Sequence, residues 1–279
     1  MEQHETKEII AVRGLRRNFE VGGETVKALR GISFSIREGE FVTIMGTSGS
    51  GKSTLLNLLG CLDTPTDGEY ILDGTEVQSM SKNRRAVTRN RKIGFVFQNY
   101  NLLPKTTAIE NVELPLLYNP AVSASERRAR AIKALEAVGL AGRLNHKSNQ
   151  MSGGQQQRVA IARALVNDPV IILADEATGN LDTRTSFSIL SLFQEFHRRG
   201  RTIIFVTHNP DLARYSSRNI VLRAGRIVSP PRGPARAGEG GVAGGWAVGG
   251  GRRGGGGGWR GGGGGGGWRG GGGGGGKKI

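Results

Sequence analysis

An eight-residue loop from Gly46 to Ser53, with the sequence GTSGSGKS, constrains the fold of this chain more than any other segment. The apolar run Phe41–Met45 predicts a strand before the loop, and leucines at helical spacing predict a helix after it at Lys52–Leu59. Glycines allow the backbone N–H groups of such a loop to surround phosphate oxygens, and the helix N-terminus adds a positive dipole end. An ordinary glycine-rich turn is the alternative, but it would need neither the strand nor the helix. The pattern therefore predicts a nucleotide triphosphate site in an α/β fold.

The side chains of this loop are expected to contact both the phosphates and a metal ion. We expect Lys52 to reach the β- and γ-phosphates and the Ser53 hydroxyl to bind Mg²⁺. The remaining nucleotide-binding residues expected here are Gly46, Thr47, Ser48, Gly49, Ser50, Gly51 and Thr54. The loop thus predicts ATP and Mg²⁺ as ligands.

A second apolar run, Val170 to Ala174, is followed directly by Asp175 and Glu176. A buried strand that ends in a carboxylate is how α/β folds place an acid near Mg²⁺. We expect Asp175 to hold the metal, through water, and Glu176 to act on the attacking water as a base or an orienting group. A pair of acids that caps a helix is the alternative, and the phosphate loop upstream disfavours it.

The rest of the pattern alternates strands with helices. Strands are predicted at Ile9–Val12, Ile32–Ile36, Glu69–Leu72, Ile93–Phe97, Thr202–Thr207, Asn219–Leu222 and Arg226–Val228, with a hairpin at Asn18–Thr25. Helices are predicted at Gln155–Val166 and Thr183–Arg198. Because the central strands are apolar throughout, we expect a mostly parallel sheet that is covered on both faces.

Apolar residues also recur at helical spacing between Lys105 and Gln150. Ser123 and Glu126 have the spacing of a capping box, in which each side chain bonds the other residue's backbone N–H. We therefore expect a helical subdomain at about residues 105–150.

The composition changes abruptly near Pro230. Of the 47 glycines, 28 follow Arg232, as do all three tryptophans, so we predict a disordered tail at residues 230–279. Two Trp-Arg pairs, at 259–260 and 268–269, are similar to Arg/Gly segments that bind RNA by charge and stacking. A flexible appendage and the product of an altered reading frame are the alternatives, and the abrupt break favours these two.

Charge and cysteine content limit the binding partners and the cellular compartment that we expect for this chain. The net charge of +16 divides into +7 on the tail and +9 on the rest, which suggests anionic neighbours such as nucleotide, an acidic membrane leaflet or nucleic acid. Cys61 is the only cysteine, which excludes an intrachain disulfide and indicates a reducing compartment; its apolar surroundings predict a buried thiol. The N-terminus has no apolar core like that of a signal peptide, and no apolar run approaches the length of a membrane span. We therefore expect a soluble or peripheral chain.

A succession of short motifs carries a resemblance to a known family. The phosphate loop is followed by Gln98, MSGGQ at 151–155, DE at 175–176, GNLD at 179–182 and TH at 207–208, which resembles the motif order of ATP-binding cassette ATPases over about residues 8–229. The segments NLLGCLD at 57–63, FQNYNLLP at 97–104 and GGQQQR at 153–158 are similar to the macrolide-exporter and lipoprotein-releasing branch. The resemblance implies a P-loop NTPase fold at residues 1–229, with a mostly parallel sheet, an antiparallel β subdomain and the inserted helical subdomain.

The resemblance also implies a role for the glycine-rich signature and for the residues around the γ-phosphate. Ser152, Gly153, Gly154 and Gln155 open a helix, and they would cover the γ-phosphate held by a second copy of the chain in a two-fold dimer. Asp182 would organise the dimer contact near the catalytic water.

Three other residues receive roles in the same way. Gln98 would touch Mg²⁺ or water and report to the helical subdomain, and His208 would bond the γ-phosphate and keep the water in line. Phe19 stands where the family has an aromatic residue that stacks on adenine; a core phenylalanine is the alternative.

Three positions depart from the family pattern. Met151 replaces the usual leucine, which conserves volume, while Ala177 and Ser148 stand where proline is usual. Ala177 is expected to loosen the Glu176 carboxylate and so to affect turnover rather than binding.

The resemblance implies the ATP-hydrolysing subunit of a transporter that powers export or lipoprotein release through a separate membrane permease. Such a subunit would be a cytoplasmic homodimer, peripheral at the inner face of the cell membrane. The alternatives are a cell-division cassette ATPase and a soluble cassette ATPase that acts on nucleic acid or ribosomes. The latter usually has two cassettes or a long coiled coil between phosphate loop and signature. Only 99 residues separate Lys52 from Ser152, without a heptad run, so a nucleic-acid partner is not expected.

Overall fold

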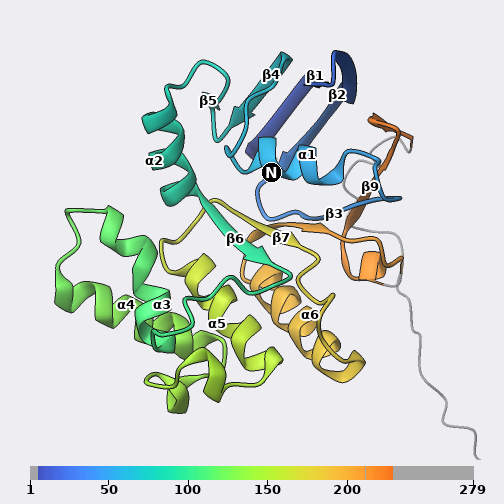
Figure 1. Ribbon diagram of the computed structural model, residues 1–279. Helices are drawn as coiled ribbons and strands as arrows, with labels where there is room; N and C mark the ends of the chain where they lie inside the picture. Colours follow the sequence, from blue (N-terminus) through green and yellow to red (C-terminus); the bar gives the residue numbers. More distant parts are fainter. Residues whose placement is uncertain (1–5, 211, 229–279) are drawn as a thin grey trace, which may run out of the picture. The chain divides into compact units, whose positions relative to one another are not determined.

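A mostly parallel sheet forms the centre of the structure, with its six strands in the order β10-β9-β3-β8-β7-β6 (Figure 1). The strands are β3 (Phe41–Gly46), β6 (Ile93–Phe97), β7 (Ile171–Asp175), β8 (Thr202–Val206), β9 (Arg218–Arg223) and β10 (Arg226–Ile227). Every neighbouring pair is parallel except the β9–β10 hairpin. The expected sheet is confirmed, and because parallel strands end at one edge, the loops after β3, β6, β7 and β8 meet there.

This computed structural model describes residues 6–210 and 212–228. The expected tail at residues 230–279, with its two Trp-Arg pairs, lies outside the described residues.

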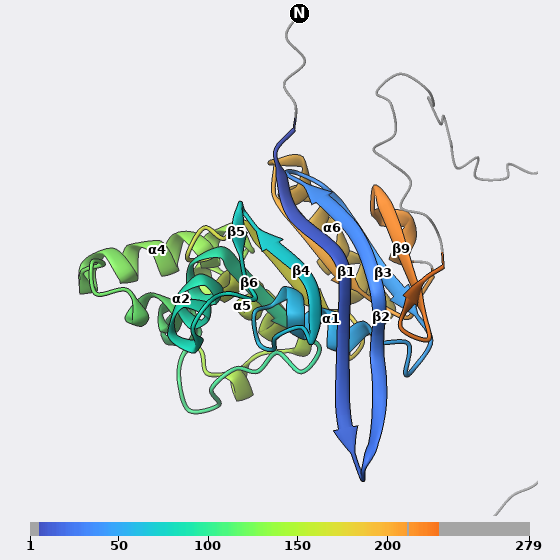
Figure 2. The ribbon, with the colours of Figure 1, turned by 90° about the horizontal axis from the view of Figure 1, so that it is seen from above.

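A second, antiparallel sheet has the order β2-β1-β4-β5. Its strands are β1 (Glu8–Val21), β2 (Glu24–Arg37), β4 (Asp67–Leu72) and β5 (Thr75–Glu76). The two long strands β1 and β2 run side by side and meet at the hairpin around Gly22 and Gly23 (Figure 2). Both glycines have positive φ angles, of 60° and 84°, which a tight turn of this kind requires. The antiparallel β subdomain implied by the resemblance is therefore present.

Six α-helices accompany the sheets in the described ranges, together with short 3₁₀ turns. The α-helices are α1 (Lys52–Leu59), α2 (Lys82–Lys92), α3 (Ala108–Glu113), α4 (Ala124–Ala137), α5 (Gly153–Leu165) and α6 (Thr183–Arg198). The 3₁₀ turns are Leu114–Tyr118, Ala141–Arg143, Ser148–Gln150 and Leu212–Tyr215. Helices α3 and α4 lie in the segment where the helical subdomain is expected, and they pack on each other and on α5 (Figure 1).

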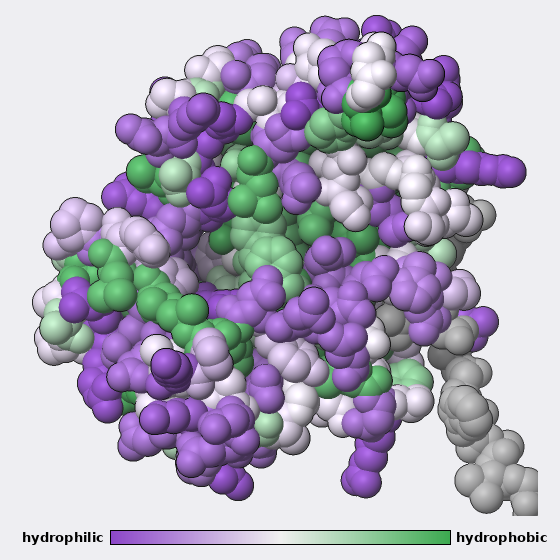
Figure 3. Space-filling model, in the orientation of Figure 1, coloured by the Kyte–Doolittle hydropathy of each residue, from purple (hydrophilic) through white to green (hydrophobic). Residues whose placement is uncertain are grey.

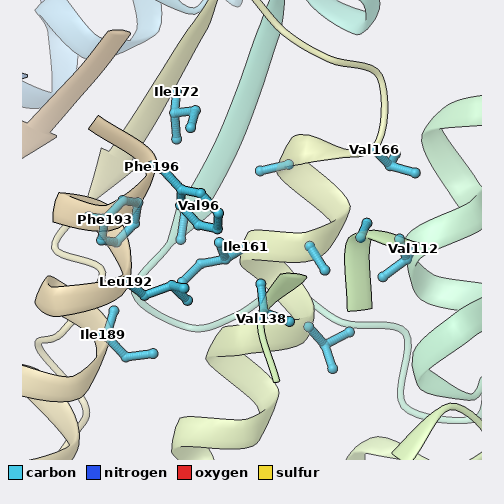
Figure 4. Packing of buried hydrophobic residues seen from close by; sticks show 14 of the residues in the cluster. Val96, Val112, Val138, Ile161, Val166, Ile172, Ile189, Leu192, Phe193 and Phe196 are labelled. Atoms are coloured by element: carbon cyan, nitrogen blue, oxygen red, sulfur yellow. The ribbon is translucent and has the colours of Figure 1, made fainter. Parts of the chain in front are cut away.

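The middle strands β3, β7 and β8 of the larger sheet are buried on both faces, as their largely apolar sequences predict, whereas β9 alternates buried residues with more exposed ones. In β7, Ile171 and Leu173 belong to the cluster that contains α1 and the antiparallel sheet. Ile172 and Ala174, which point the other way, join the cluster built from α5 and α6 (Figure 4). Cys61 is buried in the first of these clusters, as expected.

Two local features differ from the sequence expectations. Helix α2 was not predicted, because its sequence KNRRAVTRNRK offers only two apolar residues and none of its residues is buried. The expected capping box at Ser123 and Glu126 is wrong. Ser123 Oγ accepts a bond from the Glu126 N–H at 3.3 Å, but the Glu126 carboxylate pairs with Arg130 one turn later. The ion pair at i, i+4 spacing replaces the return bond to the cap.

Within the described ranges, we find no helix that combines the length and apolar character needed to cross a bilayer.

Candidate functional site

The loop between β3 and α1 folds around its own lysine. Lys52 Nζ donates hydrogen bonds to the carbonyl oxygens of Gly46 at 2.8 Å and of Thr47 at 2.9 Å. Helix α1 begins at Lys52 and has no acidic residue in its first turn, so the positive end of its dipole is not offset by a carboxylate. The ammonium group and the helix end therefore make an electropositive anion site.

The glycines of this loop are required by its backbone. Gly49 and Gly51 have φ angles of 73° and 102°, in the region that favours glycine. A Cβ atom on Gly51 would also lie 2.8 Å from the Ala28 carbonyl oxygen. A side chain at residue 51 would thus push the loop away from β2, which packs against it.

Glu176 and His208 contact each other directly, from the ends of two neighbouring strands. Glu176 follows β7, His208 lies two residues beyond β8, and the Nδ1 atom of His208 is 2.8 Å from Oε1 of Glu176. Glu176 adopts a φ of 43°, which is uncommon outside glycine, and its N–H donates to the Val206 carbonyl oxygen at 2.9 Å. The backbone bond to β8 holds Glu176 in a strained backbone conformation, as is frequent at functional sites.

Asp175, the last residue of β7, carries a destabilised carboxylate. Burial raises the pKa of Asp175, the neighbouring Glu176 charge raises it further, and Lys52 opposes both. A carboxylate in this setting gains from a cation beside it, because the cation relieves both the desolvation and the repulsion.

These residues line one cavity of about 690 Å³, formed by loop residues 48–54 with Asp175, Glu176 and His208. The cavity is completed by residues that the sequence did not reveal, which are Val26, Lys27, Ala28, Arg30, Val206, Ala224 and Gly225. Most come from β2 and from the β9–β10 turn, where no motif marks them. These residues are brought together only in the folded structure, where the N–H of Arg30 donates to the Gly225 carbonyl oxygen at 2.9 Å and so joins β2 to the β9–β10 turn.

Gln98 follows β6, and it is bonded to the turn after β7. Its Nε2 donates to Asn180 Oδ1 at 3.0 Å, and Asn180 Nδ2 donates to Asn99 Oδ1 at 2.7 Å. Gln98 and Glu176 line a second cavity, of about 370 Å³. Asn180 lies in the GNLD segment but was assigned no role from the sequence.

The signature residues open helix α5 as a complete capping box. Ser152 Oγ accepts from the Gln155 N–H at 3.4 Å, and Gln155 Oε1 accepts from the Ser152 N–H at 3.0 Å. Gly154 packs so tightly that a Cβ atom would lie 2.5 Å from Thr185 Cγ2 on α6. Ser152, Gly154 and Gln155 line a shallow recess with Arg158 and Arg184, and this recess shares no residue with the phosphate-loop cavity. The structure therefore does not bring the signature to the phosphate loop of its own chain.

Asp182 and Phe19 lie outside the phosphate-loop cavity. Asp182 caps α6 by accepting a bond from the Thr185 N–H at 3.0 Å, and the Thr185 side chain together with this backbone N–H lowers the pKa of Asp182. Phe19 is 37% exposed, which excludes the alternative of a core phenylalanine, and the Arg17 guanidinium lies 4.6 Å from its ring centre. Its cross-strand partner Val26, not Phe19 itself, lines the cavity.

The two positions where proline is usual are both buried. The carbonyl oxygen of Ala177 accepts a bond from Gln157 Nε2 at 2.7 Å, which anchors the segment after Glu176 to α5. Ser148 Oγ is buried and has no hydrogen-bond partner within residues 6–210 and 212–228. Ser148 therefore contributes an unpaired polar group, whereas Ala177 is held in place.

The donor set fits ATP and Mg²⁺. Ser50 Oγ is a buried hydroxyl in the phosphate loop without a partner in the described residues, and Lys52 supplies the positive charge. Ser53, Asp175 and Gln98 offer the oxygen ligands that Mg²⁺ prefers. No cluster of three or more His, Cys, Asp or Glu that could hold a metal is found within the described ranges.

Comparison with known proteins agrees with this geometry. The model of the ABC transporter family matches residues 29–179. An ABC transporter ATP-binding protein of Thermotoga maritima is 56% identical over 79% of this chain and 94% of its own length. The macrolide export ATP-binding/permease protein MacB of Brucella melitensis is 50% identical over 79% of this chain, which spans about a third (34%) of that protein.

Solved structures show the same fold. A dimeric bacterial ABC transporter cassette is 47% identical, with a TM-score of 0.73 over 79% of this chain and 97% of that one. A dimeric post-hydrolysis state of an ATP-binding cassette, bound to ADP and phosphate, gives the same TM-score of 0.73 at 46% identity.

Proposed function

The chain belongs to the ABC transporter family as an ATP-binding cassette subunit, and from this premise we propose that it hydrolyses ATP to drive transport through a separate membrane permease. The observation that carries the proposal is the convergence of three loops on one cavity. The phosphate loop, the acid pair and His208 lie far apart in the sequence, yet they line the same 690 Å³ space.

The residues of this cavity have complementary chemical tasks. Lys52 and the loop N–H groups bind the phosphate oxygens, and Glu176 takes the proton of a water whose oxygen attacks the γ-phosphorus. The bond from that phosphorus to the bridging oxygen of ADP breaks as the new bond forms. His208 orients Glu176 through their 2.8 Å contact, in which Nδ1–H donates to the carboxylate. In the doubly protonated imidazolium form, its Nε2–H would also donate to the γ-phosphate. Mg²⁺, when bound by Ser53, Asp175 and Gln98, supplies further neutralisation of phosphate charge.

The second copy of the chain completes the site. The signature recess lies apart from the phosphate-loop cavity, although both helix ends are suited to anions. A two-fold dimer would bring Ser152, Gly153 and Gly154 of each copy over the triphosphate of the other, with Asp182 near the contact. Dimeric cassettes of the same fold support this arrangement.

Phe19 remains our proposal for the adenine contact. Its ring lies at the surface of β1, opposite Val26, which lines the cavity. Stacking on a purine would use the exposed ring without disturbing the core.

A groove beside β6 is our candidate for the permease contact. It has a volume of about 850 Å³, and Figure 3 shows apolar side chains gathered in a hollow of this face. Its lining includes Val87 of α2 and Tyr118, which are 51% and 79% exposed. Asn101, three residues after Gln98, also lines the groove, so a bound segment could act on Gln98 through the intervening chain. Exposed apolar side chains of this kind mark docking surfaces for protein segments.

A permease docked in this groove would hold the subunit peripherally at the cytoplasmic face of the cell membrane. Relatives described as macrolide export proteins support export as the direction of transport.

The test combines hydrolysis with co-purification. Wild-type protein should release phosphate from Mg-ATP and co-purify with a membrane permease rather than with RNA. Val87→Asp should abolish permease capture while leaving ATP binding intact. Val21→Asp, at a valine on the β1–β2 hairpin that is 61% exposed against 51% for Val87, should leave both permease capture and ATP binding intact. Recovery of RNA without a permease would reject the transport function. Capture of a permease without phosphate release would reject the ATPase function.

A further inference from the structure

Within the described residues, the side chain of Asn180 alone makes the hydrogen bonds that connect the turn after Glu176 to Gln98. Asn180 Nδ2 donates to Asn99 Oδ1 at 2.7 Å and to the Gln98 carbonyl oxygen at 3.3 Å. Asn180 Oδ1 accepts from Gln98 Nε2 at 3.0 Å. Three bonds from one exposed residue thus connect the loop after β7 to the loop after β6.

The partners fix the orientation of both amides. The backbone oxygen of Gln98 can only accept a bond, so the end of Asn180 that faces it must be the NH₂ group. The other end of Asn180 is therefore its oxygen, and the end of Gln98 that faces this oxygen must be Nε2. It follows that the Gln98 oxygen, Oε1, is the end of the amide left for other ligands.

The backbone also holds Gln98 against this turn. A Cβ atom on Gly179 would lie 2.7 Å from Gln98 Nε2 and 3.0 Å from Cδ, so only glycine admits the amide at this place. The Gly179 N–H donates to the Glu176 carbonyl oxygen at 2.8 Å, which connects this turn to the backbone of the proposed base. Gln98 and Glu176 line the same 370 Å³ cavity. The amide is therefore confined on one side by Gly179 and on the other by Asn180.

We propose that Asn180 is a positioning residue, which holds the Gln98 amide with Oε1 directed to the metal and its water. This inference rests on the proposed function, because it presumes that Gln98 is a ligand at the ATP site. Asn180 itself touches neither nucleotide nor metal in this assignment. Its contribution is to prevent the amide from rotating and offering Nε2, which repels a cation.

The test measures metal binding rather than turnover. Full-length protein with Glu176→Gln, which retains its nucleotide, is titrated with Mn²⁺ at saturating ATP, and bound Mn²⁺ is followed by electron paramagnetic resonance. Asn180→Ala should weaken Mn²⁺ binding by about 3- to 10-fold, because, of its three bonds, the one lost from the Gln98 amide is a single neutral hydrogen bond. ATP binding in EDTA should be unchanged. Asn145→Ala, at an exposed asparagine in the 145–147 loop, is the matched control and should leave Mn²⁺ binding unchanged.

A double-mutant cycle separates this inference from the function on which it rests. Gln98→Ala should weaken Mn²⁺ binding, and adding Asn180→Ala should weaken it no further, because Asn180 acts only through Gln98. If Gln98→Ala has no effect, the assigned role of Gln98 is wrong and the inference falls with it. If Gln98→Ala weakens binding but Asn180→Ala does not, or if the two effects add, Asn180 does not position the amide and the ATP site stands without it.

Discussion

His208 Nδ1 lies 2.8 Å from Glu176 Oε1, although the two residues are 32 positions apart in the chain. The contact crosses from the end of β8 to the end of β7, which are adjacent parallel strands. Its geometry restricts the carboxylate to one orientation, and the Glu176 backbone is restrained by its own bond to Val206. A base held in this way needs little rearrangement when the attacking water arrives.

Glu176→Gln should lower the rate of phosphate release by about 10²- to 10⁴-fold, because the amide cannot accept the proton of the water. Nucleotide binding should persist, since the phosphate loop is untouched, and the variant should accumulate as a nucleotide-bound dimer. Phosphate release and size-exclusion chromatography with Mg-ATP measure the two effects. A monomer with normal turnover would contradict the role assigned to Glu176.

His208→Ala should also slow hydrolysis, but it should add little to Glu176→Gln. The two side chains act as a unit through their mutual contact, and effects within a unit are not additive. Single-turnover hydrolysis by the two single variants and the double variant gives the coupling directly. Independent effects that multiply would show that His208 acts without Glu176.

Lys52→Ala should weaken ATP binding by about 10- to 100-fold, which corresponds to the loss of one charge-assisted hydrogen bond to phosphate. Fluorescent ATP analogues report the affinity. Lys133→Ala, at an exposed lysine of α4, is the matched control and should bind as wild type does. Unchanged affinity in the Lys52 variant would remove the phosphate loop from the nucleotide site.

Ser148→Pro should increase the free energy of unfolding by about 0.5–1 kcal/mol, because proline reduces the entropy of the unfolded chain. Ser148 is the first residue of a 3₁₀ turn, and Lys147 before it has φ −82° and ψ 161°, the extended backbone that precedes proline readily. The substitution also removes the buried, unpaired hydroxyl. Urea denaturation measures the change, and Ser148→Ala separates the hydroxyl effect from that of the backbone. A lower urea midpoint in the proline variant would contradict the argument.

The sequence predicted well those parts of the fold whose signal is local. Helix α1 and strand β6 have the expected bounds, because a leucine stripe and an apolar run between polar residues define them. Helix α2 escaped prediction because its residues are polar and exposed, so no buried face imposes a pattern. The Ser123 capping box failed because the sequence could not indicate that Glu126 would pair with Arg130 instead.

The candidate site also contains residues that the sequence predicted and residues that it did not. Lys52, Asp175, Glu176 and His208 were recognisable, since Asp175 ends a strand of the parallel sheet and the other three lie in the segments that follow such strands. The contribution of β2 was not, because Ala28 and Arg30 reach the cavity only through the packing of one sheet on the other. The role of Asn180 could not be predicted from the sequence either, since it depends on the orientation of the Gln98 amide and not on the spacing of a motif.

Asp175→Asn should stabilise the protein at neutral pH in the absence of nucleotide and metal. The pKa of Asp175 is raised in the folded state above the ordinary value of 3.8, so the folded protein binds this proton more tightly than the unfolded chain. The stability from that proton is fully present below the unfolded pKa and is lost as pH rises through the folded pKa. At pH 7 the ionised carboxylate therefore lowers the free energy of unfolding, and its removal should raise Tm by about 2 °C. The gain should shrink as the pH approaches 4.

Asp182→Asn is a control of opposite sign. The side chain and the backbone N–H of Thr185 lower the pKa of Asp182, so this carboxylate contributes stability that is present above the unfolded pKa and is lost as pH falls through the folded pKa. Asp182→Asn should thus lower Tm at pH 7, and the loss should shrink toward acid pH. Thermal melts of both variants and wild type, recorded from pH 8 down to below the ordinary aspartate pKa of 3.8, measure both effects, because the Asp182 contribution is lost only in that acid range. If Asp175→Asn lowers Tm at pH 7 without Mg-ATP, the ionised carboxylate stabilises the folded protein without a cation. The electrostatic argument that places a cation beside Asp175 would then be wrong.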